Sequence, residues 1–165
     1  MISISIRTLE KSDLEALFDV AQRAWRYTYR GILPPEFIER WIDANYSAKV
    51  ILPLFPTIQA GKMAFFVATD ANNIVGFANM GDRGRGMELI RIYLLPEYLR
   101  MGIGSALLEE CEKFAIGRGA TSYFCYVVAR NKIGVQFYQK HKFRHVPLKD
   151  EYGQLYMEKE LEPQE

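Results

Sequence analysis

The chain has 165 residues, the usual length of one domain, and 49% of them are hydrophobic, which is enough to build a core. Its 21 Lys and Arg residues nearly balance its 20 Asp and Glu residues, which excludes a general binder of nucleic acid or of anionic membranes. No run approaches the roughly 18 apolar residues of a membrane span, and the N-terminus lacks the apolar core of a signal peptide, so we expect one domain over residues 1–165 in the cytoplasm.

The first third of the chain predicts one strand followed by helices. Isoleucine alternates with polar residues over positions 2–6, which is the periodicity of a strand. Ser12 and Glu15 form a capping-box pattern, and the helix that they start is expected to run to Trp25. A second helix is expected from the prolines at 34–35 to about residue 44, with a short helical piece over 47–52.

The middle of the chain predicts an antiparallel meander. Apolar runs at residues 64–68, 74–78 and 88–95 have the length and composition of strands. Turn-forming residues separate them at 70–73 and 83–86. Three strands joined by short turns pair most simply with their neighbours in sequence.

The last part of the chain alternates strands and helices. A helix of about fifteen residues begins after residue 102 and ends at Gly117 and Gly119. The remaining elements follow as strand 122–128, helix 132–141, strand 143–147 and strand 155–161. This order predicts an α+β fold with a mixed, mostly antiparallel sheet, flanking helices and one parallel crossover between the strands near residues 90 and 125.

Two cysteines and two histidines occur in the whole chain. Cys111 and Cys125 have no short spacing, and His141 and His145 lie far from them in sequence. A zinc site needs more ligands than this, so we expect no metal and two reduced, buried cysteines.

A glycine turn joins the third predicted strand of the meander to the following helix. Residues 96–108 read PEYLRMGIGSALL. Such a turn directs backbone N–H groups and the positive end of the helix dipole at one point, which suits a phosphate. The turn lacks the Gly-Lys-Ser/Thr of a Walker A loop and the third glycine of the dinucleotide fingerprint. Alone, it is equally compatible with a plain strand-to-helix turn.

The turn resembles a motif of the GCN5-related N-acetyltransferase family, in which Arg/Gln-x-x-Gly-x-Gly/Ala grips the pyrophosphate of acetyl-CoA. Typical members read PEYRGKGIGSALL at this place. Leu99 stands at the usual Arg/Gln position and Arg100 at the usual first glycine. We expect a retained phosphate site in which Arg100 supplies the charge from one position later.

A second block makes the resemblance more specific. Residues 131–143 read NKIGVQFYQKHKF, similar to the family's N-x-x-A-x-x-F-Y-x-K-x-G-F. Gly134 replaces the family's alanine and Lys142 replaces its glycine. The resemblance implies the acyl-CoA N-acyltransferase fold, with a splayed central strand pair that holds the pantetheine arm. It assigns cofactor contacts to Tyr93, Leu94, Arg100, Met101, Gly102, Ile103, Gly104, Ser105, Asn131 and Tyr138.

The resemblance also implies the catalytic groups. The backbone N–H of Leu94 would stabilise the oxyanion, and Tyr138 would protonate the leaving thiolate. Glu88 matches a base glutamate of some protein-acetylating members, although many members use a water relay instead. Read without the family, Tyr138 is a packing aromatic, Glu88 a strand-end surface carboxylate and Asn131 a helix N-cap.

The resemblance places the acceptor-site loop in the segment 25–30, between the first two helices. Tyr27 and Tyr29 are the candidate substrate-binding residues, because aromatic rings pack on aliphatic amines and cover cations. Trp25 is expected in the core instead. The acidic side chains that would favour a polycation are Glu36, Glu39 and Asp43. The arginines of the turn 83–86, Arg83 and Arg85, are interpreted as a solvated turn and not as a nucleic-acid patch.

The leading hypothesis is an acetyl-CoA-dependent N-acetyltransferase that acts on a primary amine of a small molecule or peptide by direct attack in a ternary complex. A polyamine such as spermidine is the first acceptor to try. One alternative is a non-catalytic acyl-CoA sensor on the same fold, and another is a nucleotide-binding regulatory module. No nucleic-acid or membrane partner is expected. The strand at residues 155–161 leaves a monomer and a homodimer open.

Overall fold

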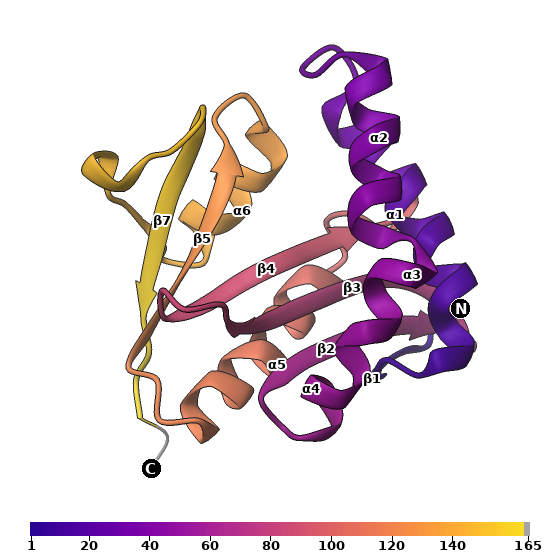
Figure 1. Ribbon diagram of the computed structural model, residues 1–165, viewed down its shortest axis with the longest axis horizontal. Coiled ribbons are helices and arrows are strands. Elements are labelled where there is room, and N and C mark those ends of the chain that lie inside the picture. The colour runs from indigo at the N-terminus through magenta and orange to yellow at the C-terminus, as the bar shows by residue number, and fades with distance from the viewer. Residues whose placement is uncertain (164–165) are drawn as a thin grey trace.

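The computed structural model describes residues 1–163, whose strands form a seven-stranded mixed sheet in the order β1-β2-β3-β4-β5-β7-β6 (Figure 1). The strands are β1 Ile4–Thr8, β2 Met63–Asp70, β3 Asn73–Asp82, β4 Met87–Leu94, β5 Ser122–Val128, β6 Arg144–His145 and β7 Gln154–Glu160. Strands β1 to β4 pair antiparallel with their sequence neighbours, so the predicted meander is confirmed.

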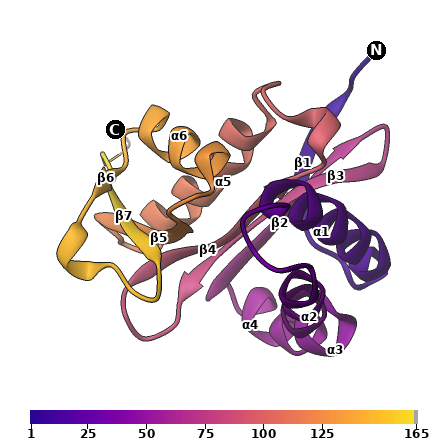
Figure 2. The same cartoon turned by 90° about the horizontal axis from the view of Figure 1, so that it is seen from above.

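Helices cover both faces of the sheet. They are α1 Leu14–Tyr29, α2 Pro35–Tyr46, α3 Ala48–Ile51, α4 Phe55–Gln59, α5 Ile103–Gly117 and α6 Lys132–Lys140. The view from above places α5 and α6 on one face and α1 to α4 on the other (Figure 2). The core lies in these two layers: α5 buries Leu107 and Cys111 against the sheet, whereas Leu17 and Ile42 are buried on the opposite face. No helix among residues 1–163 is both long and apolar enough to cross a membrane.

Strands β4 and β5 form the parallel pair of the sheet, and they separate soon after they meet. Their register consists of a single pair, Glu88 with Phe124. Beyond this pair β5 continues along β7, so no strand within residues 1–163 pairs with this edge of the later part of β4. The expected splayed strand pair and the α+β class are therefore confirmed.

A β-bulge lies in β4 beside the splay. Asn79 of β3 pairs with Arg91, but the next residue, Met80, pairs with Leu89. Ile90 is therefore the extra residue of β4. A bulge increases the local twist and bends the strand, which turns the second half of β4 away from β5.

Both cysteines are buried and unpaired, as predicted. Burial raises the pKa of the Cys111 thiol to about 12, and it also raises the pKa of Cys125. Neither thiol is a nucleophile at neutral pH in this state, because the thiolate is the reactive form.

The first helix is longer than predicted. It continues past Trp25 to Tyr29, because these two rings lie one turn apart on the same buried face, with centroids 4.3 Å apart. It ends at Arg30 and Gly31, where Gly31 has φ 77°. The expected loop over 25–30 is therefore wrong, and Tyr27 and Tyr29 belong to the last turn of α1.

The strand expected over 143–147 is shorter than predicted and consists of β6 alone. Phe143 instead closes the end of α6, because its N–H donates to the carbonyl of Tyr138 at 3.0 Å. Pro147 starts a 3₁₀ turn over Pro147–Lys149. Since proline has no N–H, it cannot extend the ladder.

Candidate functional site

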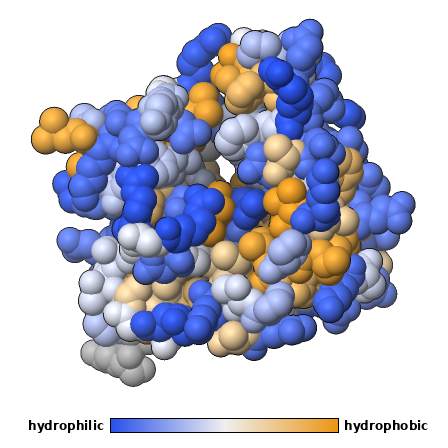
Figure 3. Space-filling view, in the orientation of Figure 1, coloured by the Kyte–Doolittle hydropathy of each residue, from blue (hydrophilic) through white to orange (hydrophobic). Residues whose placement is uncertain are grey.

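A cleft opens where β4 and β5 separate. Its walls come from the β4 residues 89–94, from Tyr126 and Val127 of β5, and from the start of α6. The space-filling view shows the surface hollowed at the centre of this face, between the part that carries β5 and β7 and the part that carries α1 and α2 (Figure 3). The cleft lies at the topological break of the sheet, where backbone groups lack strand partners.

The free edge of β4 directs backbone groups into this cleft. The N–H of Leu95 donates to the carbonyl of Val75 in β3 at 2.8 Å. Because successive residues of a strand direct their backbone groups to opposite sides, Leu94 and Ile92 direct theirs away from β3. The structure thus brings the predicted Leu94 N–H to the cleft. It adds Ile92, which sequence reasoning missed although its spacing of two from Leu94 was a usable signal.

Gly76 of β3 makes room for Leu94. A Cβ at position 76 would lie 2.2 Å from Cδ2 of Leu94 and 3.1 Å from the carbonyl oxygen of Tyr93. The close approach of β3 to this part of β4 therefore requires glycine. Sequence reasoning placed Gly76 in a strand and gave it no role.

The glycine turn folds as the motif predicts, with two left-handed residues. Arg100 has φ 63° and Gly102, the N-cap of α5, has φ 81°. The first helical hydrogen bond runs from the N–H of Ala106 to the carbonyl of Gly102 at 3.1 Å. The N–H groups of Ile103, Gly104 and Ser105 therefore point out of the helix start, where they suit an anion.

Side chains of the turn point in different directions. Arg100 and Met101 are exposed, and Leu99 lines the cleft. The Ser105 hydroxyl lies 2.9 Å from Nε2 of His141, at the end of α6. This contact leaves the backbone N–H of Ser105, rather than its hydroxyl, available to a ligand. A Cβ at Gly104 would lie 3.1 Å from the Phe137 ring, so glycine also allows α5 to pack against α6.

Tyr138 and Asn131 line the cleft from the α6 side. Tyr138 is only 8% exposed, and burial, followed by the neighbouring Cys125, raises its pKa well above 10. The phenol is therefore protonated at neutral pH and able to donate. Asn131 caps α6, since its Oδ1 accepts from the N–H of Gly134 at 3.0 Å. The N-cap interpretation of Asn131 is confirmed.

Three polar side chains connect across the cleft wall. The hydroxyls of Tyr29 and Tyr93 lie 2.7 Å apart, and Nδ2 of Asn131 lies 3.5 Å from the Tyr29 hydroxyl. Burial is the largest cause that raises the pKa of Tyr29. Tyr27, in contrast, is 53% exposed and does not line the cleft. Trp25 is buried and donates from Nε1 to the Tyr46 hydroxyl at 3.2 Å, so its predicted place in the core is confirmed.

Glu88 is buried behind an arginine. Its side chain is 10% exposed, and both carboxylate oxygens accept hydrogen bonds from Arg83, at 3.1 and 2.7 Å. The interpretation of Glu88 as a solvated strand-end carboxylate is therefore wrong. Arg83 occupies one lone pair on each oxygen, so an incoming amine must reach the remaining lone pairs of Glu88 or displace Arg83.

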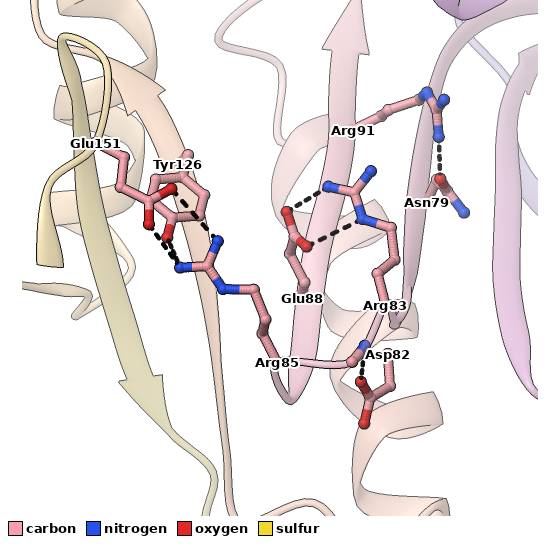
Figure 4. A network of polar contacts seen from close by, with 9 residues as sticks. Asn79, Asp82, Arg83, Arg85, Glu88, Arg91, Tyr126 and Glu151 are labelled. Atoms are coloured by element: carbon pink, nitrogen blue, oxygen red, sulfur yellow. Dashed lines mark hydrogen bonds and ion pairs between the residues drawn. The ribbon is translucent and has the colours of Figure 1, made fainter.

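Arg85, on the same hairpin, reaches across to β5 and to the segment before β7 (Figure 4). Its Nη2 donates to the Tyr126 hydroxyl at 2.7 Å and to Glu151 at 2.9 Å. The two arginines are about half exposed but are engaged by carboxylates. The predicted solvated turn is confirmed, since residues 83–86 are exposed, but the ion pairs of Arg83 and Arg85 were not predicted.

Arg91 is a further cleft residue that sequence reasoning missed. Its guanidinium donates to the side-chain oxygen of Asn79 and to the carbonyl of Asn45, and it lies 5.5 Å from the centre of the Tyr46 ring. Burial lowers the pKa of Arg91. An arginine in the middle of an apolar strand was the signal that could have identified it.

The acidic residues expected near an acceptor lie on α2, away from the cleft walls. Glu39 accepts from Arg26 at 2.7 Å, whereas Glu36 and Asp43 are exposed. Among residues 1–163, no group of three or more His, Cys, Asp or Glu side chains is arranged to hold a metal ion.

Comparisons with known proteins agree with this geometry. The model of the acetyltransferase (GNAT) family matches residues 14–143. A spermidine N(1)-acetyltransferase of Thermoplasma acidophilum is 37% identical over 144 residues, which cover 87% of this chain and 89% of that protein. A [ribosomal protein bS18]-alanine N-acetyltransferase of Escherichia coli K12 is 26% identical over 148 residues, which cover 90% of this chain and 86% of that protein. The solved PaiA N-acetyltransferase from T. acidophilum in complex with coenzyme A superposes with a TM-score of 0.90 at 35% identity, over 96% of this chain and 99% of that one.

Proposed function

The chain belongs to the GNAT family and is an acetyl-CoA-dependent N-acetyltransferase, and from that premise we propose that its acceptor is a polyamine such as spermidine. The observation that carries this proposal is the 37% identity to a spermidine N(1)-acetyltransferase over most of both chains. In the reaction a primary amine of the polyamine attacks the thioester carbonyl, so that an N–C bond forms and the C–S bond breaks.

The cleft fits the cosubstrate on two grounds. The free edge of β4 offers the N–H groups of Ile92 and Leu94 to the amides and the thioester of the pantetheine arm. The turn over 100–105 offers the N–H groups of a helix start to the pyrophosphate. In this proposal Tyr93 and Asn131 line the arm, and Arg100 adds positive charge beside the phosphates. Bound acetyl-CoA supplies the activated acetyl group.

Three groups of the chain would serve the chemical step. The N–H of Leu94 donates to the developing oxyanion, in a position fixed by the β4 strand. Tyr138 gives its phenolic proton to the leaving thiolate, since a phenol with an ordinary pKa near 10 is already protonated at neutral pH. The attacking amine loses its proton to Glu88 or to water in the cleft.

A thiol-release assay tests the function. Spermidine should raise the release of free thiol from acetyl-CoA more than amino acids, aminoglycosides and peptide N-termini do. Tyr138→Phe should lower kcat by about 100-fold or more, because general acid catalysis is worth that much. Tyr98→Phe is the matched control, since Tyr98 bonds Asp70 and does not line the cleft. Thiol release that is highest with a peptide N-terminus would contradict the polyamine proposal. A Tyr138→Phe variant with the kcat of the parent would contradict the role of the phenol.

A further inference from the structure

Two carboxylates lie beside the Leu89 end of the cleft, outside the residues that line it, and each pairs with an arginine of the hairpin between β3 and β4 (Figure 4). Arg83 pairs with Glu88 at 2.7 Å, and Arg85 pairs with Glu151 at 2.9 Å. Arg85 also donates to the hydroxyl of Tyr126, a residue of the cleft wall. The Arg85 side chain therefore connects the hairpin to β5.

The arginines are the more exposed partners of these pairs. The Arg83 side chain is 55% exposed, against 10% for Glu88. The hairpin contains Gly84 and Gly86, with φ 104° and 105°, and a Cβ added at Gly84 would meet nothing within 4 Å. Asp82 holds the backbone of this hairpin, because its Oδ1 accepts from the N–H of Gly84 at 2.7 Å and from that of Gly86 at 3.3 Å. The exposed arginine side chains can therefore leave their partners by rotation about their own bonds, whereas Glu88 is buried in β4.

An aromatic surface next to the Arg85 contacts already binds cations of the protein itself. Phe124 and Tyr156 line this surface together with Arg85 and Lys149, whereas the neighbouring Tyr126 lines the cleft. Tyr156 stacks on Phe124 at 5.0 Å and meets Tyr126 edge-on at 5.4 Å between centroids. The Arg85 guanidinium lies 5.6 Å from the centre of the Tyr126 ring, and Nζ of Lys149 lies 5.0 Å from that of Tyr156. Carboxylates combined with aromatic faces are the groups that attract alkylammonium ions.

We propose that a polyamine binds with its non-reacting ammonium group at Glu151 and Tyr126, where it displaces Arg85. In the protein without acceptor, Arg85 occupies this ammonium site. Arg83 likewise occupies Glu88 until the reacting amine enters. Glu151 is then a specificity-determining residue that favours polyamines over monoamines, and the hairpin competes with the substrate. This inference rests on the proposed polyamine function and names the residues that would recognise the part of the polyamine that does not react.

Steady-state kinetics with spermidine and with hexylamine, a monoamine of similar reach, test the inference. Glu151→Gln should raise KM for spermidine about fivefold, the loss expected for one partly exposed ion pair, and leave KM for hexylamine unchanged. Arg85→Gln should lower KM for spermidine, because the internal competitor is removed, while Arg85→Lys should stay near the parent. Glu39→Gln is the matched control, since Glu39 forms an equally exposed pair with Arg26 away from the cleft.

The outcomes separate this inference from the function on which it rests. If the parent protein acetylates no polyamine, the proposed function fails and the inference with it. If the parent acetylates spermidine but Glu151→Gln keeps the parent KM, the inference alone is overturned. A rise in KM on Arg85→Gln, with a preference for acceptors that carry a carboxylate or phosphate, would show that the arginines bind an anionic group and would also overturn it. Thermal melting of each variant checks that it is folded.

Discussion

Arg100 and Lys142 occupy positions where the family motifs have glycine, and both have the left-handed backbone conformation that favours glycine. Their φ angles are 63° and 68°. A left-handed conformation costs a residue with a Cβ roughly 1–2 kcal/mol. The chain therefore carries backbone strain at the pyrophosphate turn and at the end of α6. The strain at the end of α6 can be relieved at Lys142, which does not line the cleft.

Replacing Lys142 with glycine should stabilise the protein. Lys142 closes α6 in a Schellman motif. Its N–H donates to the carbonyl of Gln139 at 3.1 Å, and the N–H of Phe143 donates to the carbonyl of Tyr138 at 3.0 Å. Lys142→Gly keeps these bonds and removes the strain, so we expect a gain of about 0.5–1 kcal/mol after the entropy of the unfolded glycine is counted. Urea unfolding measures this change in the free energy of unfolding. Lys140→Gly, within the helix, should lower the free energy of unfolding by about as much. A decrease for both variants would contradict the strain argument.

His141 should make stability depend on pH between about 5 and 7. Burial, followed by the nearby Lys159 and Lys140, lowers the pKa of His141 below its ordinary 6.5. The unfolded chain therefore binds a proton more readily than the folded one, and stability is lost as pH falls through the unfolded value toward the folded one. His141→Asn should flatten the melting temperature between pH 7 and pH 5. A parent protein that melts at a higher temperature at pH 5 than at pH 7 would contradict the sign.

At the scale of elements, local patterns predicted the helices and strands well, and they failed where tertiary contacts decide. The end of α1 depends on the stacking of Trp25 with Tyr29 and on the burial of both rings, which the turn-like composition of the segment concealed. The bulge at Ile90 left no local signal, since its cause lies in the pairing with β3. The glycine turn was predicted because glycine and helix-start patterns are local.

Gly76 links β3 to the function of β4. Gly76→Ala should displace Leu94 and weaken acetyl-CoA binding severalfold, because the new Cβ would lie 2.2 Å from Leu94 Cδ2 and 3.1 Å from the Tyr93 carbonyl oxygen. Overpacking of this kind also costs about 1–3 kcal/mol of stability. Calorimetry with coenzyme A measures the affinity. Gly81→Ala is the matched control on β3, where the nearest atom is the flexible Met63 Cε at 3.3 Å. Equal affinity in both variants would contradict the coupling.

At the scale of the whole molecule, the order of elements and the two motifs sufficed to predict the architecture and the place of the cleft. The contacts that join distant elements of the site were not predictable, because their partners are far apart in sequence. Arg85 and Glu151 are 66 residues apart, and Tyr29 and Tyr93 are 64 apart. Such pairs follow from the three-dimensional arrangement and from no local pattern. Arg83 and Glu88 are only five residues apart, but their pairing depends on the conformation of the turn between them, so the sequence could propose Glu88 as a base without identifying its partner.

The splay divides the sheet into two parts that acetyl-CoA should hold together. The β4 and β5 strands share one residue pair, and further links are the Arg85–Glu151 pair and the Ser105–His141 contact. A ligand that lies between the strands and against the start of α5 stabilises the folded protein by mass action. At a free ligand concentration of 100 times its Kd, this stabilisation is about 2.7 kcal/mol.

Hydrogen exchange with and without coenzyme A should locate this effect. The amides of Ile92 and Leu94, which face the cleft, and those of residues 103–105, which face the turn, should gain protection, because each acquires an acceptor. Residues of β1 and β2, which are paired on the far side of the sheet, serve as the internal control and should change only as much as global stability does. Protection confined to the surface of α2, with none at Ile92 or Leu94, would contradict the assignment of the β4 edge as the binding surface.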